Sequence, residues 1–331
     1  MVIHEGVLSV IGGTPLVRLR RFLEGSDLEL CAKLELLNPG GSIKDRPAFA
    51  ILKHALETGA IRPDSVIIES SSGNMGIGLA QACSYFGLRL ICVIDPKTTV
   101  QNINLLKVYG AVVDMVESPD AQTGEFLQAR LNRVQLLLRS ISNSFWPNQY
   151  ANEHNSAAHH QTMREIVNSL GDGPDYLFCA VSTFGTLRGC AEYVRAQRLK
   201  TRIFAVDAVG SVIFGGGKAK RLIPGHGAAV RPKLFREGLA ERCIHVSDKD
   251  CIIGCRRLAR QEAILAGGSS GAVLMAIAKV REEIPARSTC VAILADRGER
   301  YLDTIYCDHW VHDHFGDIAY SWEESAREVQ A

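Results

Sequence analysis

Short apolar runs rich in β-branched residues recur along the chain, and such runs are typical of buried strands. They predict strands at residues 65–70, 88–94, 111–116, 175–181, 201–207 and 290–296. The segments between them carry apolar side chains at helical spacing, which predicts helices at residues 75–87, 101–110, 125–138 and 270–284. From about Asp308 onward the chain is polar and aromatic, and we expect this tail to wrap around the protein or to fray.

The alternation of strands and helices predicts the fold class. Parallel strands need a crossover connection, usually a helix, so the pattern favours an α/β architecture with parallel sheets between helices. The chain has 331 residues, which is longer than one hydrophobic core usually grows. Because no Pro/Gly/Ser-rich linker separates two halves, we predict two interleaved three-layer α/β lobes.

Composition and charge narrow the classes of partner. Apolar residues make up 47% of the chain and charged residues 22%, which is typical of a globular protein. The 37 basic and 36 acidic side chains give a net charge of +1, so no general field attracts nucleic acid or an anionic membrane. We therefore expect small-molecule substrates, no nucleic-acid partner and no membrane partner, with anions bound by local features.

The cysteines have the pattern of reduced thiols. Cys83, Cys92, Cys179 and Cys290 lie in apolar runs, where a thiol behaves as a small hydrophobic group. The C-x3-C pair at 251 and 255 has no second pair at zinc-finger spacing. We find neither a signal-peptide pattern nor the ~18 consecutive apolar residues of a membrane span. These features predict a soluble, cytoplasmic protein.

Four glycine-rich segments are candidates for chemistry. In NPGGSIK, residues 38–44, Lys44 follows a flexible turn and precedes a predicted helix. The other segments, at residues 69–80, 181–189 and 266–272, each lie where a helix is predicted to begin. Backbone N–H groups and hydroxyls gathered at a helix start form anion sites.

Each segment also has a plainer interpretation. Lys44 alone is compatible with a surface lysine, segment 69–80 with a serine-rich turn and segment 266–272 with a serine N-cap formed by Ser269 or Ser270. A dinucleotide-binding loop is another alternative for segment 69–80, because Asp95 ends the next strand at a suitable distance. Its glycines, however, follow G-x-x-G-x-G instead of G-x-G-x-x-G.

A lysine combined with several anion sites indicates pyridoxal phosphate, because lysine bonds to aldehydes and this cofactor carries an aldehyde and a phosphate. NPGGSIKDR, SSGNMGIGLA, STFGT, GGSSGA and DRGERYL occur in the order of the cysteine synthase and cystathionine β-synthase family. The chain resembles these fold-type II pyridoxal-phosphate enzymes from residue 8 to 305. The resemblance implies a tryptophan synthase β-like fold, with a large cofactor-binding lobe (1–42 plus 150–331) and a small mobile lobe (43–149).

The resemblance also implies roles for individual residues. Lys44 would bond to the cofactor aldehyde and move the substrate Cα proton, and Asn74 would hydrogen-bond the ring hydroxyl. Ser269 would face the pyridine nitrogen without holding it protonated, which favours β-elimination over transamination. The other implied contacts are a phosphate cup at Ser182, Thr183, Phe184, Gly185 and Thr186, and a substrate-carboxylate site at Ser71, Ser72, Met75 and Gln149.

Departures from the cysteine synthase pattern change the expected substrate. Met75 stands where threonine is usual, Phe184 where glycine is usual and Asp95 where an apolar residue is usual. The segments VDAVGSVIFGG and NQYANEHN are similar to a subgroup that joins O-phospho-L-serine to L-glutamate, making 2,3-diaminopropionate precursors for siderophores or peptide antibiotics. A sulfhydrylase that uses sulfide is an alternative, as are a serine or threonine dehydratase and a non-catalytic scaffold.

A phosphorylated substrate requires a cation that the shared motifs do not supply, because an unpaired phosphate in a closed site is costly. A guanidinium suits phosphate oxygens, so we predict Arg130, with Arg231 as the second candidate. The alternative for Arg130 is a solvated helix face. Tyr150 and Ser182 are expected to orient the substrates. The resemblance implies a homodimer, to which the apolar segment 7–19 would contribute.

Other polar groups are expected to have no such role. The segment 308–314 has metal-ligand residue types but no predicted scaffold, so we expect no metal there. His154, His159 and His160 do not converge on one helix face, so we expect them at the solvated surface. Ser42 and Lys44 lack the S-x-x-K spacing of an acyl-transfer pair.

Overall fold

The structure is a computed structural model that describes residues 3–322, and these residues form two compact units. The first unit combines the described residues up to Gly12 with Asn38–Ala158, and the second combines Gly13–Leu37 with the described residues from His159 onward. The sequence-based lobes divide after residues 42 and 149, whereas the compact units divide after residues 12, 37 and 158. Helix α5 (Glu153–Leu170) runs through the division after residue 158.

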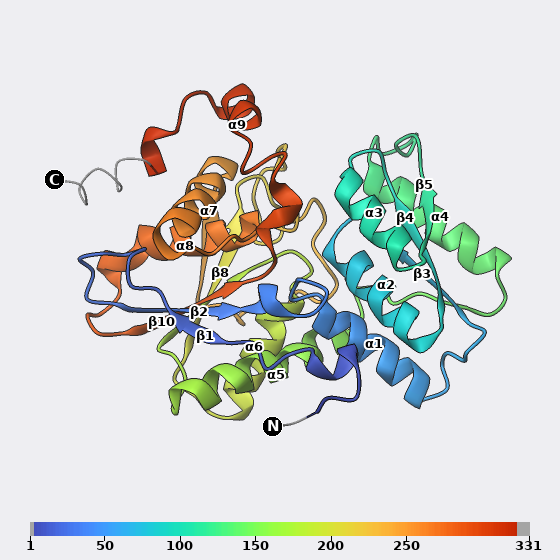
Figure 1. The fold of residues 1–331 in the computed structure, drawn as a ribbon, viewed down its shortest axis with the longest axis horizontal. Coiled ribbons are helices and arrows are strands. Elements are labelled where there is room, and N and C mark those ends of the chain that lie inside the picture. Colours follow the sequence, from blue (N-terminus) through green and yellow to red (C-terminus); the bar gives the residue numbers. More distant parts are fainter. Residues whose placement is uncertain (1–2, 323–331) are drawn as a thin grey trace. The chain divides into compact units, whose positions relative to one another are not determined.

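The first unit is built on a four-stranded parallel sheet in the order β5-β4-β3-β6. Alternate strand residues face opposite sides: Ile67 packs in a core with α1 and α2, whereas Val66 and Ile68 pack with Val134 of α4. Helices therefore cover both faces (Figure 1). The elements are β3 (Val66–Ser70), β4 (Arg89–Ile94), β5 (Val112–Met115), β6 (Ser144–Phe145), η1 (Val7–Val10), α1 (Asp45–Glu57), α2 (Asn74–Phe86), α3 (Val100–Val108) and α4 (Phe126–Ser140).

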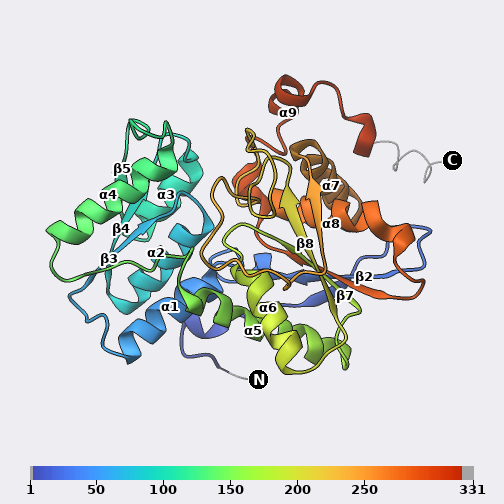
Figure 2. The same ribbon diagram turned by 180° about the vertical axis from the view of Figure 1, so that it is seen from behind.

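The second unit has a six-stranded sheet in the order β1-β2-β10-β7-β8-β9, in which β1 alone is antiparallel to its neighbour. Helices α7 and α8 lie on one face, and α6 lies on the other (Figures 1 and 2). The elements are β1 (Leu16–Arg18), β2 (Glu29–Leu34), β7 (Tyr176–Ala180), β8 (Arg202–Ala208), β9 (Arg242–Val246), β10 (Thr289–Leu294), η2 (Glu35–Leu37), α6 (Gly185–Ala196), α7 (Asp248–Glu262), α8 (Gly268–Val280), η3 (Arg281–Glu283), η4 (Gly298–Tyr301) and α9 (Asp308–Phe315).

Glycines bring α7 and α8 into backbone contact. A Cβ on Gly271 would lie 2.1 Å from the carbonyl oxygen of Cys251, and one on Gly254 would lie 2.3 Å from the carbonyl oxygen of Gly271. Real side chains do not tolerate such distances, so both positions require glycine. At least one glycine of segment 266–272 is therefore a packing residue.

The structure confirms the α/β fold and each predicted strand and helix, with ends that move by a few residues. The sequence interpretation missed β1, β2, β6 and β9, and it did not foresee the antiparallel pairing of β1. The tail forms α9, and Ile318 and Trp322 join the core of the second unit. Among the described residues, no helix is both long and apolar enough to cross a membrane.

Candidate active site

The turn before α1 holds Lys44 in a defined place. Gly41 has a φ of +83°, which favours glycine, and the N–H of Gly40 donates to Asp45 Oδ2 at 2.6 Å. The Lys44 N–H donates to the buried hydroxyl of Ser42 at 3.2 Å. Lys44 is half-buried and occupies the N-cap position of α1. The turn is therefore fixed by its own hydrogen bonds, with the lysine at the helix start.

The loop between β3 and α2 lies beside this turn. A Cβ on Gly78 of α2 would lie 3.2 Å from the Lys44 carbonyl oxygen, so the glycine lets α2 approach the start of α1 closely. Ser71 Oγ accepts the N–H of Gly76 at 2.9 Å, which fixes the first turn of α2. Asn74, the first residue of α2, is half-buried. The structure thus packs α2, which follows the predicted loop, against the start of α1 within one unit.

Arg130 on α4 reaches the same loop. Its Nη1 donates to Ser72 Oγ at 3.3 Å, and its Nε forms an ion pair with Asp95 Oδ2 at 3.2 Å. The side chains of Arg130 and Asp95 are only 14% and 7% exposed, so water screens this pair weakly. Asn102 Nδ2 also donates to the Ser72 carbonyl oxygen at 2.9 Å. The solvated helix face considered for Arg130 is therefore wrong: the guanidinium is largely buried against the loop between β3 and α2.

Glu69, which the sequence interpretation did not single out, anchors the segment that carries Gln149 and Tyr150. The buried Glu69 carboxylate at the end of β3 accepts hydrogen bonds from Trp146 Nε1 at 3.0 Å and from the N–H of Gln149 at 3.3 Å. The Gln149 carbonyl oxygen accepts from Asn155 Nδ2 at 2.7 Å. Gln149 is therefore held through its backbone at the carboxyl edge of the sheet, where α/β proteins bind ligands.

Glu69 is expected to make the stability of the protein depend on pH. Burial raises the pKa of Glu69 from 4.5 to about 7, against the hydrogen bonds that it accepts. Because the folded-state pKa exceeds the unfolded one, the buried carboxyl favours folding at low pH, and this contribution is lost as the pH rises through about 7. The shift in the pKa of Glu69 corresponds to roughly 3 kcal/mol of unfolding free energy.

The measurement is the free energy of urea unfolding of wild type and Glu69→Gln between about pH 5 and pH 9. As the pH rises, the unfolding free energy of wild type should fall by roughly 3 kcal/mol relative to that of Glu69→Gln. The variant lacks this pH dependence because an amide does not ionise. Glu57→Gln is the control, because the Glu57 side chain in α1 is 61% exposed. A pH-independent difference between wild type and Glu69→Gln would contradict the titration of this carboxyl.

The predicted phosphate cup forms the turn between β7 and α6 in the second unit. Ser182 is half-buried, and the hydroxyl-bearing residues Thr183 and Thr186 are buried. The N–H of Gly185 lies 3.4 Å from Thr183 Oγ1. The first N–H groups of a helix have no partners within the helix, and its N-terminus carries partial positive charge. This set of hydroxyls and amides suits a phosphate group.

Phe184 occupies a conformation that usually needs glycine, with a φ of +72°. A non-glycine residue there costs about 1–2 kcal/mol, which burial of the ring offsets. The Phe184 ring is 2% exposed and lies with its centroid 4.9 Å from that of Phe235 and 5.9 Å from that of Phe214. The departure from the family's glycine therefore links the cup to the segment between β8 and β9.

His159 corrects the expectation of a solvated surface. It is fully buried, its Nδ1 lies 3.2 Å from Thr162 Oγ1, and its Nε2 lies 3.3 Å from Thr186 Oγ1 in the cup. His154 instead packs against His54, with ring centroids 3.8 Å apart and the rings tilted by 31°. Helical spacing alone does not show that His159 faces α6, where Thr186 and Cys190 contact it.

Ser269 lies in the first turn of α8 and is 7% exposed. The N-cap is Gly267, which makes no side-chain cap, so the serine N-cap interpretation is wrong. The neighbouring Ser270 Oγ instead accepts the N–H of Ala295 at 3.0 Å, next to the end of β10. Segment 266–272 thus places Ser269 at a helix start and uses Ser270 to join α8 to the sheet.

Each unit, taken by itself, has donors of the kind that suit pyridoxal phosphate. The first unit has an amine at a fixed turn and a loop of hydroxyls, and the second unit has a hydroxyl-rich helix start and a serine at the start of α8. Arg231, the second candidate for a phosphate cation, lies in the second unit, where its Nε donates to the Ile213 carbonyl oxygen at 2.9 Å.

All ten cysteines are free, and eight of them are buried, as the core interpretation predicts.

Comparisons with known proteins agree with this donor chemistry. The model of the family described as "Pyridoxal-phosphate dependent enzyme" matches residues 7–296. The chain is 45% identical to N-(2-amino-2-carboxyethyl)-L-glutamate synthase of Ralstonia nicotianae over 94% of this chain and 92% of that protein.

Two solved structures share the fold. The O-acetylserine dependent cystathionine β-synthase of Helicobacter pylori matches with a TM-score of 0.86 and 30% identity, over 93% of this chain and 100% of that one. Cysteine synthase of Entamoeba histolytica matches with a TM-score of 0.86 and 32% identity, over 92% of this chain and 91% of that one. The chain therefore belongs to the pyridoxal-phosphate dependent enzyme family.

Proposed function

We propose that this enzyme joins O-phospho-L-serine to L-glutamate, giving N-(2-amino-2-carboxyethyl)-L-glutamate and phosphate. The observation that carries the proposal is the 45% identity, over nearly the full length of both chains, to a synthase of that name. The buried Arg130 beside the substrate loop supports a phosphorylated donor. The product is a precursor of L-2,3-diaminopropionate, and we propose that it serves siderophore or peptide antibiotic synthesis.

The cofactor residues are assigned from both units. When bound, pyridoxal phosphate supplies an aldehyde that bonds to amines and a ring that withdraws electrons from the attached carbon. Lys44 would hold the aldehyde carbon, Asn74 the ring hydroxyl and Ser269 the pyridine nitrogen. The cup residues Ser182, Thr183, Phe184, Gly185 and Thr186 would hold the phosphate, with the Thr186 hydroxyl oriented by His159.

The substrate residues lie at the carboxyl edge of the first sheet. Ser71, Ser72 and the N-terminus of α2 would bind the α-carboxylate, with Gln149 and Tyr150 closing the site. Met75, which is 2% exposed, shapes the loop by packing instead of by donating a hydrogen bond. The segment 43–149, which lies within the first compact unit, is our proposed mobile lobe.

The reaction exchanges one bond at Cβ of the donor. Lys44 takes the Cα proton, the Cβ–O bond breaks and phosphate leaves towards the Arg130 guanidinium. The α-amino group of glutamate then forms the Cβ–N bond and loses a proton, and Lys44 returns a proton to Cα. Exclusion of water by the closed site would prevent hydrolysis between the two halves of the reaction.

Cysteine synthase activity, with O-phosphoserine or O-acetylserine and sulfide, is the second candidate. The structural likeness to cysteine synthase supports it, because both reactions use the same donor chemistry. They differ in the nucleophile: glutamate brings two carboxylates, and sulfide brings none.

We also propose a homodimer in the cytoplasm. Val7 and Val10 of η1 are each 40% exposed, which supports an apolar N-terminal contact with a second copy. The free thiols support a reducing compartment. Sedimentation that gave only monomer at micromolar concentration would contradict the dimer.

The test of the proposed function supplies O-phospho-L-serine to the purified enzyme with either L-glutamate or sulfide. We expect phosphate release with glutamate, together with a product of matching mass, at a kcat/KM at least about tenfold above that with sulfide. D-glutamate serves as the control nucleophile. Preferential cysteine formation would establish the second candidate, and phosphate release without either nucleophile would indicate a lyase.

A further inference from the structure

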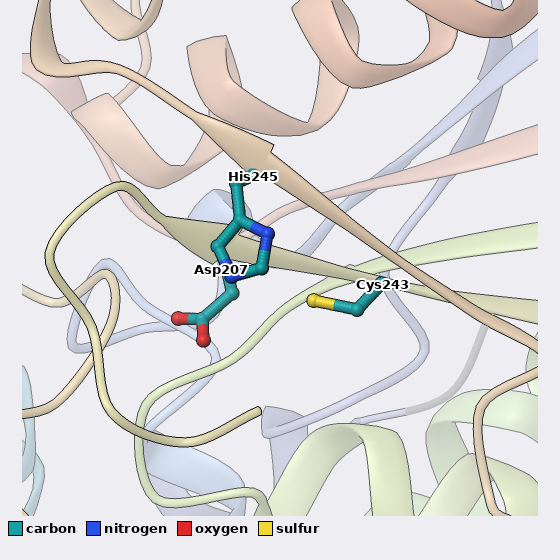
Figure 3. A group of neighbouring side chains, drawn as sticks. All are labelled: Asp207, Cys243 and His245. Carbon is teal, nitrogen blue, oxygen red and sulfur yellow. The ribbon is translucent and has the colours of Figure 1, made fainter. Parts of the chain in front are cut away.

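The sheet of the second unit carries a cluster of metal-ligand side chains that the proposed reaction does not use. The ligand atoms of Asp207 on β8, and of Cys243 and His245 on β9, all lie within 4.8 Å of one another. In the parallel β8–β9 pair, Asp207 lies opposite His245. Cys243 is two residues before His245, so both side chains leave the strand on the same face. In the view of Figure 3, the His245 ring lies between the Asp207 carboxylate and the Cys243 sulfur.

The cluster combines a buried carboxylate with two more accessible ligands. Asp207 is fully buried, and the N–H of Ala208 donates to its Oδ1 at 2.9 Å, but Oδ2 has no hydrogen-bond partner among residues 3–322. A buried carboxylate oxygen without a donor is unfavourable, and a cation would satisfy it.

Access for an ion comes from the edge of the sheet. β9 is an edge strand, so His245 is exposed and Cys243 is half-buried. The alternate residues Ile244 and Val246 face the hydrophobic core. The polar residues of this strand therefore lie on one face of the sheet, next to the buried Asp207 of the neighbouring strand.

We propose that Asp207, Cys243 and His245 bind a divalent transition-metal ion, and that Zn²⁺ fits this ligand set best. Thiolate, imidazole and carboxylate are the usual zinc ligands, and water completes a tetrahedron around three protein ligands. A tetrahedral site places neighbouring ligand atoms roughly 3.3–3.7 Å apart, so side chains within 4.8 Å need to close by only about 1 Å. Mg²⁺ and Ca²⁺ prefer oxygen ligands alone.

The position of the ion suggests what it does. Asp207 and Cys243 flank the segment 209–241, and an ion bound by both would fasten the two ends of this segment. The same segment carries Phe214 and Phe235, which pack on Phe184 of the cup. The metal would therefore stabilise the second unit and, if the proposed cofactor site is correct, the phosphate cup as well.

The experiment measures Zn²⁺ bound to the holoenzyme after dialysis, and the melting temperature with and without Zn²⁺. We expect about one high-affinity Zn²⁺ per chain and a rise of several degrees in the melting temperature. Cys243→Ser and His245→Ala should each weaken binding at least about tenfold. With Co²⁺, wild type should show the strong visible bands of a tetrahedral site, and both variants should lose them.

Cys307→Ser is the matched control, because Cys307 is the other half-buried cysteine and lies outside the cluster. It should bind Zn²⁺ as wild type does. Equal binding by wild type and all three variants, or no binding by wild type, would overturn the proposal. These readouts do not depend on turnover, so failure of the metal site and failure of the proposed reaction remain distinguishable.

Discussion

Lys44→Ala is expected to abolish the reaction. Wild type should absorb at about 410 nm, as a lysine-bound pyridoxal group does, and the variant should lose this band. Turnover of O-phosphoserine should fall at least about 10⁴-fold, because the substitution removes the residue proposed both to attach the cofactor and to move the Cα proton. Absorbance spectra and phosphate release measure the two effects separately.

Two further variants identify the cause of the loss. Lys53→Ala changes another lysine of α1 whose side chain is 55% exposed, and it should leave both the band and turnover unchanged. Lys44→Arg keeps a positive charge at the helix start but does not bond to the aldehyde at working pH, since a guanidinium stays protonated. If Lys44→Arg or Lys44→Ala retained the band, another residue would carry the cofactor.

The fold and much of the candidate site follow from local signals in the sequence. The long apolar strands and amphipathic helices predict their own structure, and the glycine-rich segments mark helix starts. Short or polar strands have no such signal: β6 spans only Ser144–Phe145, and β9 carries Arg242, Cys243 and His245. These strands form because neighbouring strands offer backbone partners, and that information is not local.

The residues that sequence interpretation missed act through tertiary contacts. Asp95 was noted as an unusual residue and as the acidic residue of a rejected dinucleotide-binding loop, but its partner Arg130 lies on another element. Glu69 ends an apolar strand and gains its role from a segment about 80 residues later. His159 was assigned to the surface because the three histidines do not converge on one helix face, and their spacing does not show that His159 contacts α6. The Asp207–Cys243–His245 cluster depends on the register of two strands, one of which was not predicted.

Arg130→Ala is expected to separate the two possible donors. A charge-assisted hydrogen bond to phosphate contributes about 1.5–3 kcal/mol, so KM for O-phosphoserine should rise roughly 10- to 100-fold or more. O-acetylserine has no charged side chain, and its KM should change little. The unfolding free energy of the variant should also be lower by about 3–5 kcal/mol, because the buried Asp95 carboxylate loses its ion pair with Arg130, whose Nε lies 3.2 Å from Asp95 Oδ2.

The double variant Arg130→Ala/Asp95→Asn resolves these two effects. Neutralising Asp95 removes the uncompensated buried charge, so stability should recover while KM for O-phosphoserine stays high. Arg133→Ala is the matched control on α4: its guanidinium pairs with Asp114 at 2.7 Å and is 43% exposed, and its loss should affect neither donor. Since Arg130 also donates to Ser72 Oγ at 3.3 Å, a merely structural role would weaken the binding of both donors equally, through the proposed carboxylate site at Ser71 and Ser72. Equal losses for O-phosphoserine and O-acetylserine in the stabilised double variant would therefore place the leaving phosphate at another cation.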